Sequence, residues 1–356
     1  MIRPLLAVAA AIASICAGLA APARAEGMLT LRDRLLVVSS NTTITVATQL
    51  VGAFADRHPG VPRPELRLAD TQPALEFFCA GIGPETPDIA ILARRMPGTM
   101  YEACQENDVR DIVEIRIGLG AIALAVNRGD PTPDLAARHV YEALAAERVS
   151  EDGFVPNRTA TWAELAPHLP DLPIRVVVPE ADSGTRQLFE DLVLEGGCRY
   201  VKGIRLIFEA AYRRSKCITL RDDGVVIAAP LLDVAAVVLA SPRGTIGVMP
   251  LTDVTGSGGN LVALSIDGVH PDPASVSALD YEPTRVVYLY AKRQHSRNRN
   301  GIGVVRGIHE MLAEATREGA IGPGGYLVNA GLIPLSPAGR LAQRQLAERM
   351  TPMSAR

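Results

Sequence analysis

Short apolar runs recur along this chain and alternate with longer stretches of mixed polarity. The apolar runs predict strands buried on both faces, at residues 35–39, 87–93, 112–117, 121–127, 174–178, 245–249 and 286–291. The longer stretches predict helices at residues 45–57, 161–165, 187–194 and 303–318, and residues 225–236 predict a strand followed by a helix. This alternation is typical of an α/β protein with mostly parallel sheets.

Glycines modify two of these predictions. Gly118 and Gly120 are expected to separate the strand segments 112–117 and 121–127, and the Gly196-Gly197 pair is expected to end the helix at 187–194. The polar residues after Pro337 predict a terminal helix or a loose tail.

Residues 1–25 have the order of a secretory signal peptide, which predicts export to the periplasm. Arg3 precedes an apolar run at 5–21, and the small-x-small sequence at 23–25 predicts cleavage before Glu26. A membrane anchor is the alternative, but the run is short, rich in alanine and followed by a cleavage-like site. The roughly 330 residues that would remain exceed what one compact core holds, so two lobes are expected.

The charge balance limits the choice of partner. Loss of residues 1–25 would reduce the 36 basic residues to 34 against 39 acidic ones, a net charge of −5. The chain as a whole therefore has no basic excess to attract a nucleic acid or an anionic membrane surface. Aromatic residues make up only 4% of the chain, which argues against a carbohydrate cleft built from stacked rings.

Four cysteines would remain after cleavage: Cys79, Cys104, Cys198 and Cys217. An even number in an oxidising compartment predicts two disulfides. The sequence allows three pairings, of which we favour the local one, Cys79–Cys104 with Cys198–Cys217. A zinc site is the alternative, but the sequence has neither a CxxC motif nor a nearby pair of histidines.

The first candidate site follows the strand at 35–39 and consists of Ser39, Ser40, Asn41, Thr42 and Thr43. These small polar residues precede a helix, whose free backbone N–H groups, together with the hydroxyls, suit an anion. Helix capping alone is the simpler interpretation, although one serine or asparagine would suffice for it.

The second candidate site follows the strand at 174–178 and consists of Asp182, Ser183, Gly184, Thr185 and Arg186. Glycine lets the backbone approach a ligand closely, while the hydroxyls, the helix start and the arginine offer donors and charge.

The third candidate site is Arg94 with Arg95, directly after the strand at 87–93. Two arginines at a strand end can make bidentate contacts to an oxyanion, and a solvated surface pair is the alternative. The sequence contains no GxSxG elbow, no Walker loop and no GxGxxG after a strand, so we expect neither a catalytic centre nor a cofactor.

Several motifs occur in an order that resembles the PstS-like phosphate-binding proteins of ABC importers, within the type II periplasmic-binding-protein superfamily. The resemblance covers roughly residues 35–335. It rests on the sequences SSNTT at 39–43, FCAG at 78–81, DIA at 88–90, GAIALAVN at 120–127, TWAEL at 161–165, DSGT at 182–185, YLYAK at 288–292 and GLIPL at 331–335.

The resemblance implies a fold of two α/β lobes, with mixed sheets flanked by helices and a ligand cleft between them. We expect residues 29–119 and 250–335 to form lobe 1, residues 120–249 to form lobe 2, and residues 336–356 to form a C-terminal tail. It implies a monomeric, non-enzymatic receptor that captures phosphate, or a similar oxyanion, for an ABC permease. All three candidate loops would bind the ligand, without metal or cofactor.

The chain departs from the family pattern at two positions near the ligand. Ala93 stands where many relatives have serine, and Pro179 stands where the second loop often begins with arginine. The same fold binding another oxyanion, an organophosphate or a phosphonate, as a sensor or scavenger without transport, is the alternative that these departures leave open.

Overall fold

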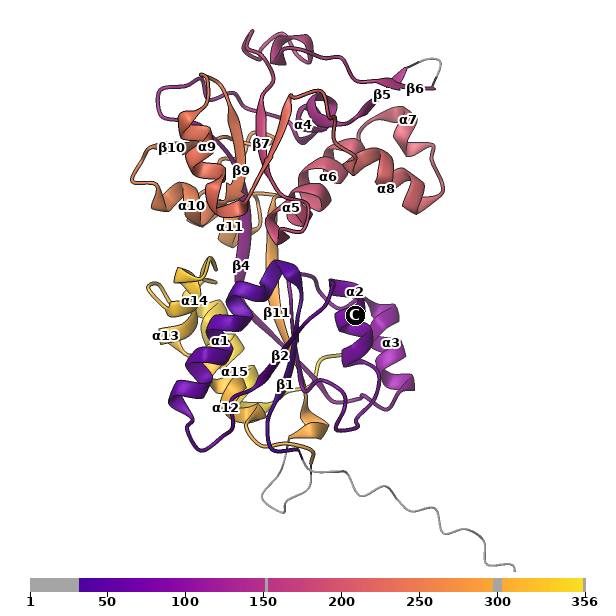
Figure 1. Cartoon of the computed structure of the whole chain (residues 1–356). Coiled ribbons are helices and arrows are strands. Elements are labelled where there is room, and N and C mark those ends of the chain that lie inside the picture. Colours follow the sequence, from indigo (N-terminus) through magenta and orange to yellow (C-terminus); the bar gives the residue numbers. More distant parts are fainter. Residues whose placement is uncertain (1–31, 151–152, 297–302, 355–356) are drawn as a thin grey trace, which may run out of the picture.

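The computed structural model of this chain describes residues 32–150, 153–296 and 303–354. The predicted signal peptide at residues 1–25 lies outside this part of the chain. Figure 1 shows two lobes joined by strands β4 (Ile112–Asn127) and β11 (Thr284–Lys292). These two strands pair antiparallel along their length, from Thr284 opposite Ala121 to Lys292 opposite Ile112. The two-lobed α/β fold expected from the sequence is therefore confirmed.

The main sheet contains parallel and antiparallel strands, and the strand directions at its centre follow from the hinge. Its order is β2-β1-β3-β11-β4-β9-β7-β8, with β10 beside β4. The outer strands pair in parallel, as the alternation predicts, whereas β11 and β4 pair antiparallel with each other and with their other neighbours. The chain passes between the lobes in both directions, so the prediction of mostly parallel sheets is wrong at the centre. The other strands of this sheet are β1 (Leu36–Ser39), β2 (Glu65–Leu68), β3 (Ile89–Leu92), β7 (Val176–Pro179), β8 (Val226–Ala229), β9 (Ile246–Pro250) and β10 (Leu261–Ala263).

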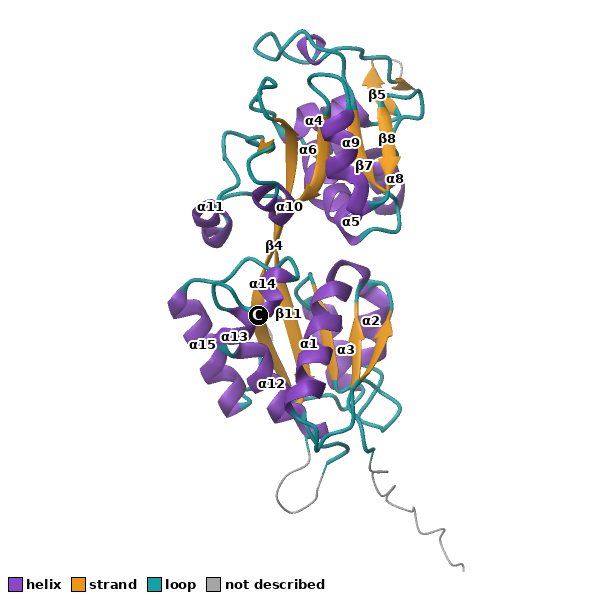
Figure 2. Cartoon of the chain, turned by 60° about the vertical axis from the view of Figure 1, so that its left-hand side comes forward, coloured by secondary structure: helices purple, strands orange, loops and turns teal. Residues whose placement is uncertain are grey.

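Helices cover both faces of the first lobe's sheet, which explains why its strands are uninterrupted apolar runs. Val37 and Ile91 pack into a core with α1 and α12, whereas Val38 and Leu92 face the opposite core with α2 and α3. Figure 2 shows these two groups of helices on either side of the strands. The helices are α1 (Ile44–Arg57), α2 (Thr71–Phe78), α3 (Gly98–Glu106), α12 (Ile308–Thr316), α13 (Glu318–Ile321), α14 (Tyr326–Asn329) and α15 (Pro337–Arg349), with the 3₁₀ turns η1 (Asn41–Thr43) and η5 (Arg293–His295).

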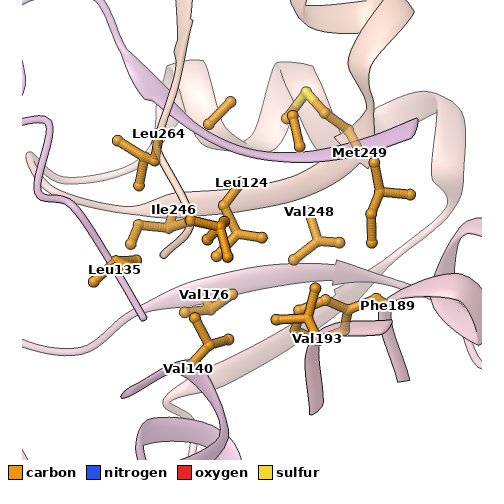
Figure 3. Packing of buried hydrophobic residues seen from close by; sticks show 14 of the residues in the cluster. Leu124, Leu135, Val140, Val176, Phe189, Val193, Ile246, Val248, Met249 and Leu264 are labelled. Carbon is orange, nitrogen blue, oxygen red and sulfur yellow. The ribbon is translucent and has the colours of Figure 1, made fainter. Parts of the chain in front are cut away.

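The second lobe packs around β7, β9 and the C-terminal part of β4. Figure 3 shows its core, in which Leu124, Val176, Val248 and Phe189 meet from three strands and a helix. Its helices are α4 (Ala137–Leu144), α5 (Gly184–Phe189), the π-helical η3 (Glu190–Leu194), α6 (Glu195–Cys198), α7 (Lys202–Arg205), α8 (Ala210–Ile218), α9 (Val234–Ala240), α10 (Leu251–Gly256) and α11 (Pro273–Ala278), with η2 (Trp162–Glu164), η4 (Leu231–Asp233) and the hairpin β5 (Glu147–Ser150) and β6 (Gly153–Pro156).

The packing differs from the predicted division of the chain between the lobes. Leu251, Val276 and Tyr281 belong to the second lobe's core, although residues 250–335 were assigned to lobe 1. The cause is β10, which pairs with β4, so that the chain returns to the first lobe only along β11. The predicted tail contains α15, whose Ala347 is buried in the first lobe's core.

Two of the glycines expected to interrupt regular structure, Gly118 and Gly197, serve close packing instead. Strand β4 continues through Gly118, where an added β-carbon would lie 3.1 Å from the side chain of Leu332. The helical segment that begins at Gly184 continues to Cys198 through Gly197, where a β-carbon would lie 2.1 Å from the carbonyl oxygen of Ala137. The predicted helix at 303–318 begins only at Ile308, since Gly307 has a φ of 99°.

Two disulfides form between near neighbours in sequence, Cys79–Cys104 and Cys198–Cys217. The favoured local pairing is thereby confirmed. None of the helices among the described residues is both long enough and apolar enough to cross a bilayer.

Candidate functional site

A cavity of about 620 Å³ lies between the lobes, where two of the predicted loops meet. The loop after β1 belongs to the first lobe and the loop after β7 belongs to the second. Strands β4 and β11 contribute the wall at the hinge. The lining includes Asn41, Thr42, Ala93, Gly120, Asp182, Ser183, Gly184, Thr185 and Arg285.

The first loop divides into an inward part and a part that faces the cavity. Ser39, Ser40 and Thr43 are buried, and the Thr43 hydroxyl lies 2.9 Å from the Ser39 hydroxyl and 3.0 Å from that of Ser40. The Thr43 hydroxyl also donates to a main-chain carbonyl at the end of β3, at 2.7 Å. Of the five predicted residues, Asn41 and Thr42 line the cavity. The three inward hydroxyls therefore hold the turn in place.

The second loop contributes four of its five predicted residues to the cavity wall, from Asp182 to Thr185. The Ser183 hydroxyl is buried and has no hydrogen-bond partner among the described residues. A buried hydroxyl without a partner costs about 1–3 kcal/mol, so it is a strong donor for a ligand that reaches it. The loop opens the helical segment that runs from Gly184 to Cys198, and the first backbone N–H groups of a helix have no partner within the helix.

Arg186 has a different role from the one that its position in the motif predicts. Its Nε donates to the Glu190 carboxylate at 2.8 Å, and its NH1 donates to the carbonyl of Pro179 at 3.2 Å. It is absent from the residues that line the cavity. The side chain therefore ties the start of the helix to the end of β7, and its contact with a ligand stays a prediction.

Arg94 and Arg95 line a second, adjoining compartment of about 930 Å³. Arg95 forms an ion pair with Glu114, with 3.1 Å between its Nε and Oε2, and this pair raises the pKa of Arg95. Arg94 is exposed and forms no ion pair or hydrogen bond through its side chain within the described chain. Of the two arginines, Arg94 is the one whose charge is free to act on an anion.

Arg285 also lines the cavity, although the sequence patterns did not single it out. It lies on β11 opposite Gly120, it is half-buried, and it lines both compartments of the cleft. Its guanidinium has no hydrogen bond or ion pair with any described residue, and burial lowers its pKa, with Arg94 adding to this effect. In the sequence, Arg285 stands near the start of a predicted strand, where a solvent-exposed arginine is ordinary. Only the geometry of the hinge shows that its side chain lines the cavity.

The cavity wall also carries carboxylates, namely Glu180, Asp182 and Asp253. Desolvation raises the pKa of Asp253. In the adjoining compartment, Asp191 and Glu195 are paired with Arg214, whereas neither Arg285 nor Arg94 forms an ion pair within the described residues. Arg285, which lines both compartments, therefore presents a guanidinium that no described carboxylate binds directly.

Comparisons with known proteins agree with the two-lobed fold. A model described as the PBP superfamily domain matches residues 22–303. The protein SphX of Synechococcus elongatus is 22% identical over 294 residues, which cover 80% of this chain and 77% of the relative. SphX of Synechocystis is 23% identical over 261 residues, covering 72% of this chain and 68% of the relative.

Two solved structures show the same fold at low sequence identity. A possible phosphate-binding protein from Planctomyces limnophilus has a TM-score of 0.65 at 17% identity, covering 90% of this chain and 99% of the other. An ABC-type phosphate transport receptor from Vibrio cholerae has a TM-score of 0.57 at 15% identity, covering 84% and 99%.

Proposed function

The chain belongs to the PBP superfamily, and on that premise we propose that it is a periplasmic receptor that captures inorganic phosphate for an ABC importer. The observation that carries the proposal is the pair of unsatisfied donors in the cleft, the buried hydroxyl of Ser183 and the guanidinium of Arg285. Both groups lose water on burial and gain no partner within the described chain, so an anion between them would satisfy both.

The choice of phosphate has two supports. Solved structures with this fold include a possible phosphate-binding protein and a phosphate transport receptor. The cavity between the two loops offers hydroxyls and backbone N–H groups together with the guanidinium of Arg285, beside three carboxylates, and these donors suit a small tetrahedral oxyanion. Local donors thus allow an acidic protein to bind an anion.

Arg285 would supply the charge that the second loop lacks. Pro179 stands where relatives often have an arginine, and Arg186 is occupied by Glu190. A cation from the hinge strand would approach the same space from the opposite wall. The loops at Asn41–Thr42 and Asp182–Thr185 would then hold the ligand from the two lobes, and hinge motion along β4 and β11 would open and close the site.

We further infer export through the signal peptide at residues 1–25, function as a monomer, and release of the ligand to a permease of the inner membrane. No chemistry on the ligand is part of this proposal. Among the described residues, no group of three or more His, Cys, Asp or Glu could hold a metal ion.

The test is a titration of the mature protein with orthophosphate, sulfate, molybdate and a phosphonate, followed by calorimetry and by thermal unfolding. Orthophosphate is expected to raise the melting temperature by several degrees, because a ligand at a hundredfold excess over its Kd stabilises the folded state by about 2.7 kcal/mol. A larger shift with another oxyanion would reassign the ligand, and the absence of any shift would refute the proposal.

A further inference from the structure

The segment between Cys198 and Cys217 forms an arm at the edge of the second lobe, with helices α7 and α8 (Figure 1). The disulfide closes its base, with 5.5 Å between the two Cα atoms. Ile204 is fully buried in a small core that contains both cysteines together with Tyr141 and Ala145 from the body of the lobe. Val201 and Ile207 pack against this core. The inward apolar positions of the arm are therefore filled.

Large apolar side chains also point outward from this arm. Phe208 is 94% exposed, Leu206 is 73% exposed, Tyr200 is 66% exposed and Tyr212 is 49% exposed. They alternate with the inward residues, since Leu206 and Phe208 flank the inward Ile207. The small core beneath the arm consists of other residues, so these four side chains are not part of it. Four large apolar side chains exposed within one short segment indicate an interaction surface.

The arm is strongly basic, although the whole chain has a net charge of −3. Residues 198–217 contain six basic side chains and one acidic one, Glu209, so the segment carries a net charge of +5. The carboxylate of Glu209 accepts hydrogen bonds from backbone N–H groups at the start of α8. The low net charge of the chain therefore conceals a local excess of positive charge.

Part of this positive charge is already neutralised. Arg199 and Arg214 form ion pairs with acidic residues of the neighbouring helices, and Lys216 is paired with Glu147. The remaining cations are Lys202, Arg205 and Arg213, which form no ion pair within the described residues. Unpaired cations beside exposed aromatic and aliphatic side chains are the combination that binds an interface between water and anionic lipid.

We propose that the 198–217 arm docks this protein on a membrane surface that contains anionic phospholipids. Phe208 and Leu206 would enter the headgroup region, while Lys202, Arg205 and Arg213 would contact the lipid phosphates. Ala210 and Arg213 also line the basic compartment of the cleft, so docking would bring the mouth of the cleft close to the membrane. The proposal does not depend on which anion the cleft binds.

The test is sedimentation of the full mature chain with vesicles of phosphatidylcholine alone or with added phosphatidylglycerol. Binding is expected only with phosphatidylglycerol, and raised salt is expected to weaken it. The double variant Leu206→Ser/Phe208→Ser is expected to lose binding at least tenfold. Lys202→Glu/Arg205→Glu is expected to lose more, because each basic side chain contributes about fivefold to the affinity for an anionic surface.

The matched control is Leu341→Ser, because Leu341 is a 53% exposed leucine on α15 of the other lobe. It is expected to bind vesicles like the unmodified protein, and all variants are expected to keep their melting temperatures. Equal binding to both vesicle types, or no effect of the arm variants, overturns the proposal. Cross-linking to an envelope protein that depends on the arm, without vesicle binding, would also overturn it and would point to a protein partner.

Discussion

Gly184 of the second lobe lies directly against Thr42 of the first lobe, so closely that an added β-carbon would be 2.4 Å from the Cα of Thr42. That distance is far below any van der Waals contact, and the obstacle is main chain, which cannot rotate away. The two loops that line the cavity can therefore meet only because one of them carries a glycine at this position. The contact lies between the lobes, so it controls closure rather than the folding of either lobe.

Replacement of Gly184 by alanine should consequently weaken ligand binding without unfolding the protein. We expect the Kd for phosphate to rise at least tenfold in calorimetry, because the first loop would be displaced from the ligand. The melting temperature without ligand should stay the same or rise slightly, since alanine is the better helix former. Gly52→Ala in α1 is the control, because no atom lies within 4 Å of its added β-carbon. An unchanged Kd for Gly184→Ala would show that the loops do not meet around the ligand.

Ser183→Ala and Ser39→Ala should have opposite effects, although both serines belong to the predicted loops. The buried hydroxyl of Ser183 has no partner, so its removal should leave the ligand-free protein equally or more stable while phosphate affinity falls at least tenfold. The Ser39 hydroxyl is bonded to Thr43, so its removal should cost about 1 kcal/mol of stability and affect affinity less. Denaturant unfolding and calorimetry of both variants would reveal this crossing pattern. Loss of stability in Ser183→Ala would mean that its hydroxyl already has a structural partner.

Arg285→Gln should lower phosphate affinity by roughly ten- to a hundredfold, because a hydrogen bond to a charged group contributes about 1.5–3 kcal/mol. Arg186→Gln is the comparison, since it removes an arginine of the motif that is already bound to Glu190 and to Pro179. Arg186→Gln should lower the melting temperature more than Arg285→Gln does. Any loss of phosphate affinity in Arg186→Gln should largely disappear at low temperature. If Arg186→Gln abolishes binding and Arg285→Gln does not, the charge in the cleft comes from the motif after all.

The features that the sequence predicts correctly are those that depend on residues close together in the chain. The strands β1, β3 and β7 are short apolar runs because helices cover both of their faces, and this pattern is visible without coordinates. The loops that follow β1 and β7 line the cavity as predicted, although their part in ligand binding remains a prediction. The local disulfide pairing was also predictable, because the partners of each pair are 25 and 19 residues apart.

The errors concern contacts that exist only once the chain has folded. Gly197 resembles a helix terminator in sequence. In the structure the helix continues through it, and the main chain at the start of α4 leaves no room for a side chain there. Arg285 resembles a strand end, but the return of β11 through the hinge places it in the cleft. Arg186 resembles a ligand residue, but its guanidinium forms an ion pair with Glu190, one helical turn further on. In each case the residue's role depends on a neighbour that lies on another element or that comes into contact only when the helix forms.

Stability should depend on pH through Lys292, which is fully buried in the first lobe. Its ammonium donates to the Gly81 carbonyl at 2.6 Å and to the Thr86 hydroxyl at 2.8 Å, and it lies 5.0 Å from the centre of the Phe78 ring. Burial lowers its pKa to about 7, although the nearby Asp88 opposes this effect.

The sign of the effect follows from proton binding in the two states. Between pH 7 and the unfolded value near 10.4, the unfolded chain binds more protons at this site than the folded chain does. The free energy of unfolding should therefore rise with pH across this window, by at most about 1.4 kcal/mol per pH unit, and the cost of burying the charge should be fully present below pH 7. Burial also lowers the pKa of His295, so its effect falls on the acid side of the window.

Denaturant unfolding at pH about 7, 8 and 9 should show this rise in the unmodified protein. Lys292→Met should remove the slope, whatever its absolute stability, because the group that titrates is gone. Lys202→Met, which removes an exposed lysine of α7, should keep the slope. A slope that survives in Lys292→Met would assign the pH dependence to another group and would mean that Lys292 stays charged in the folded protein throughout this range.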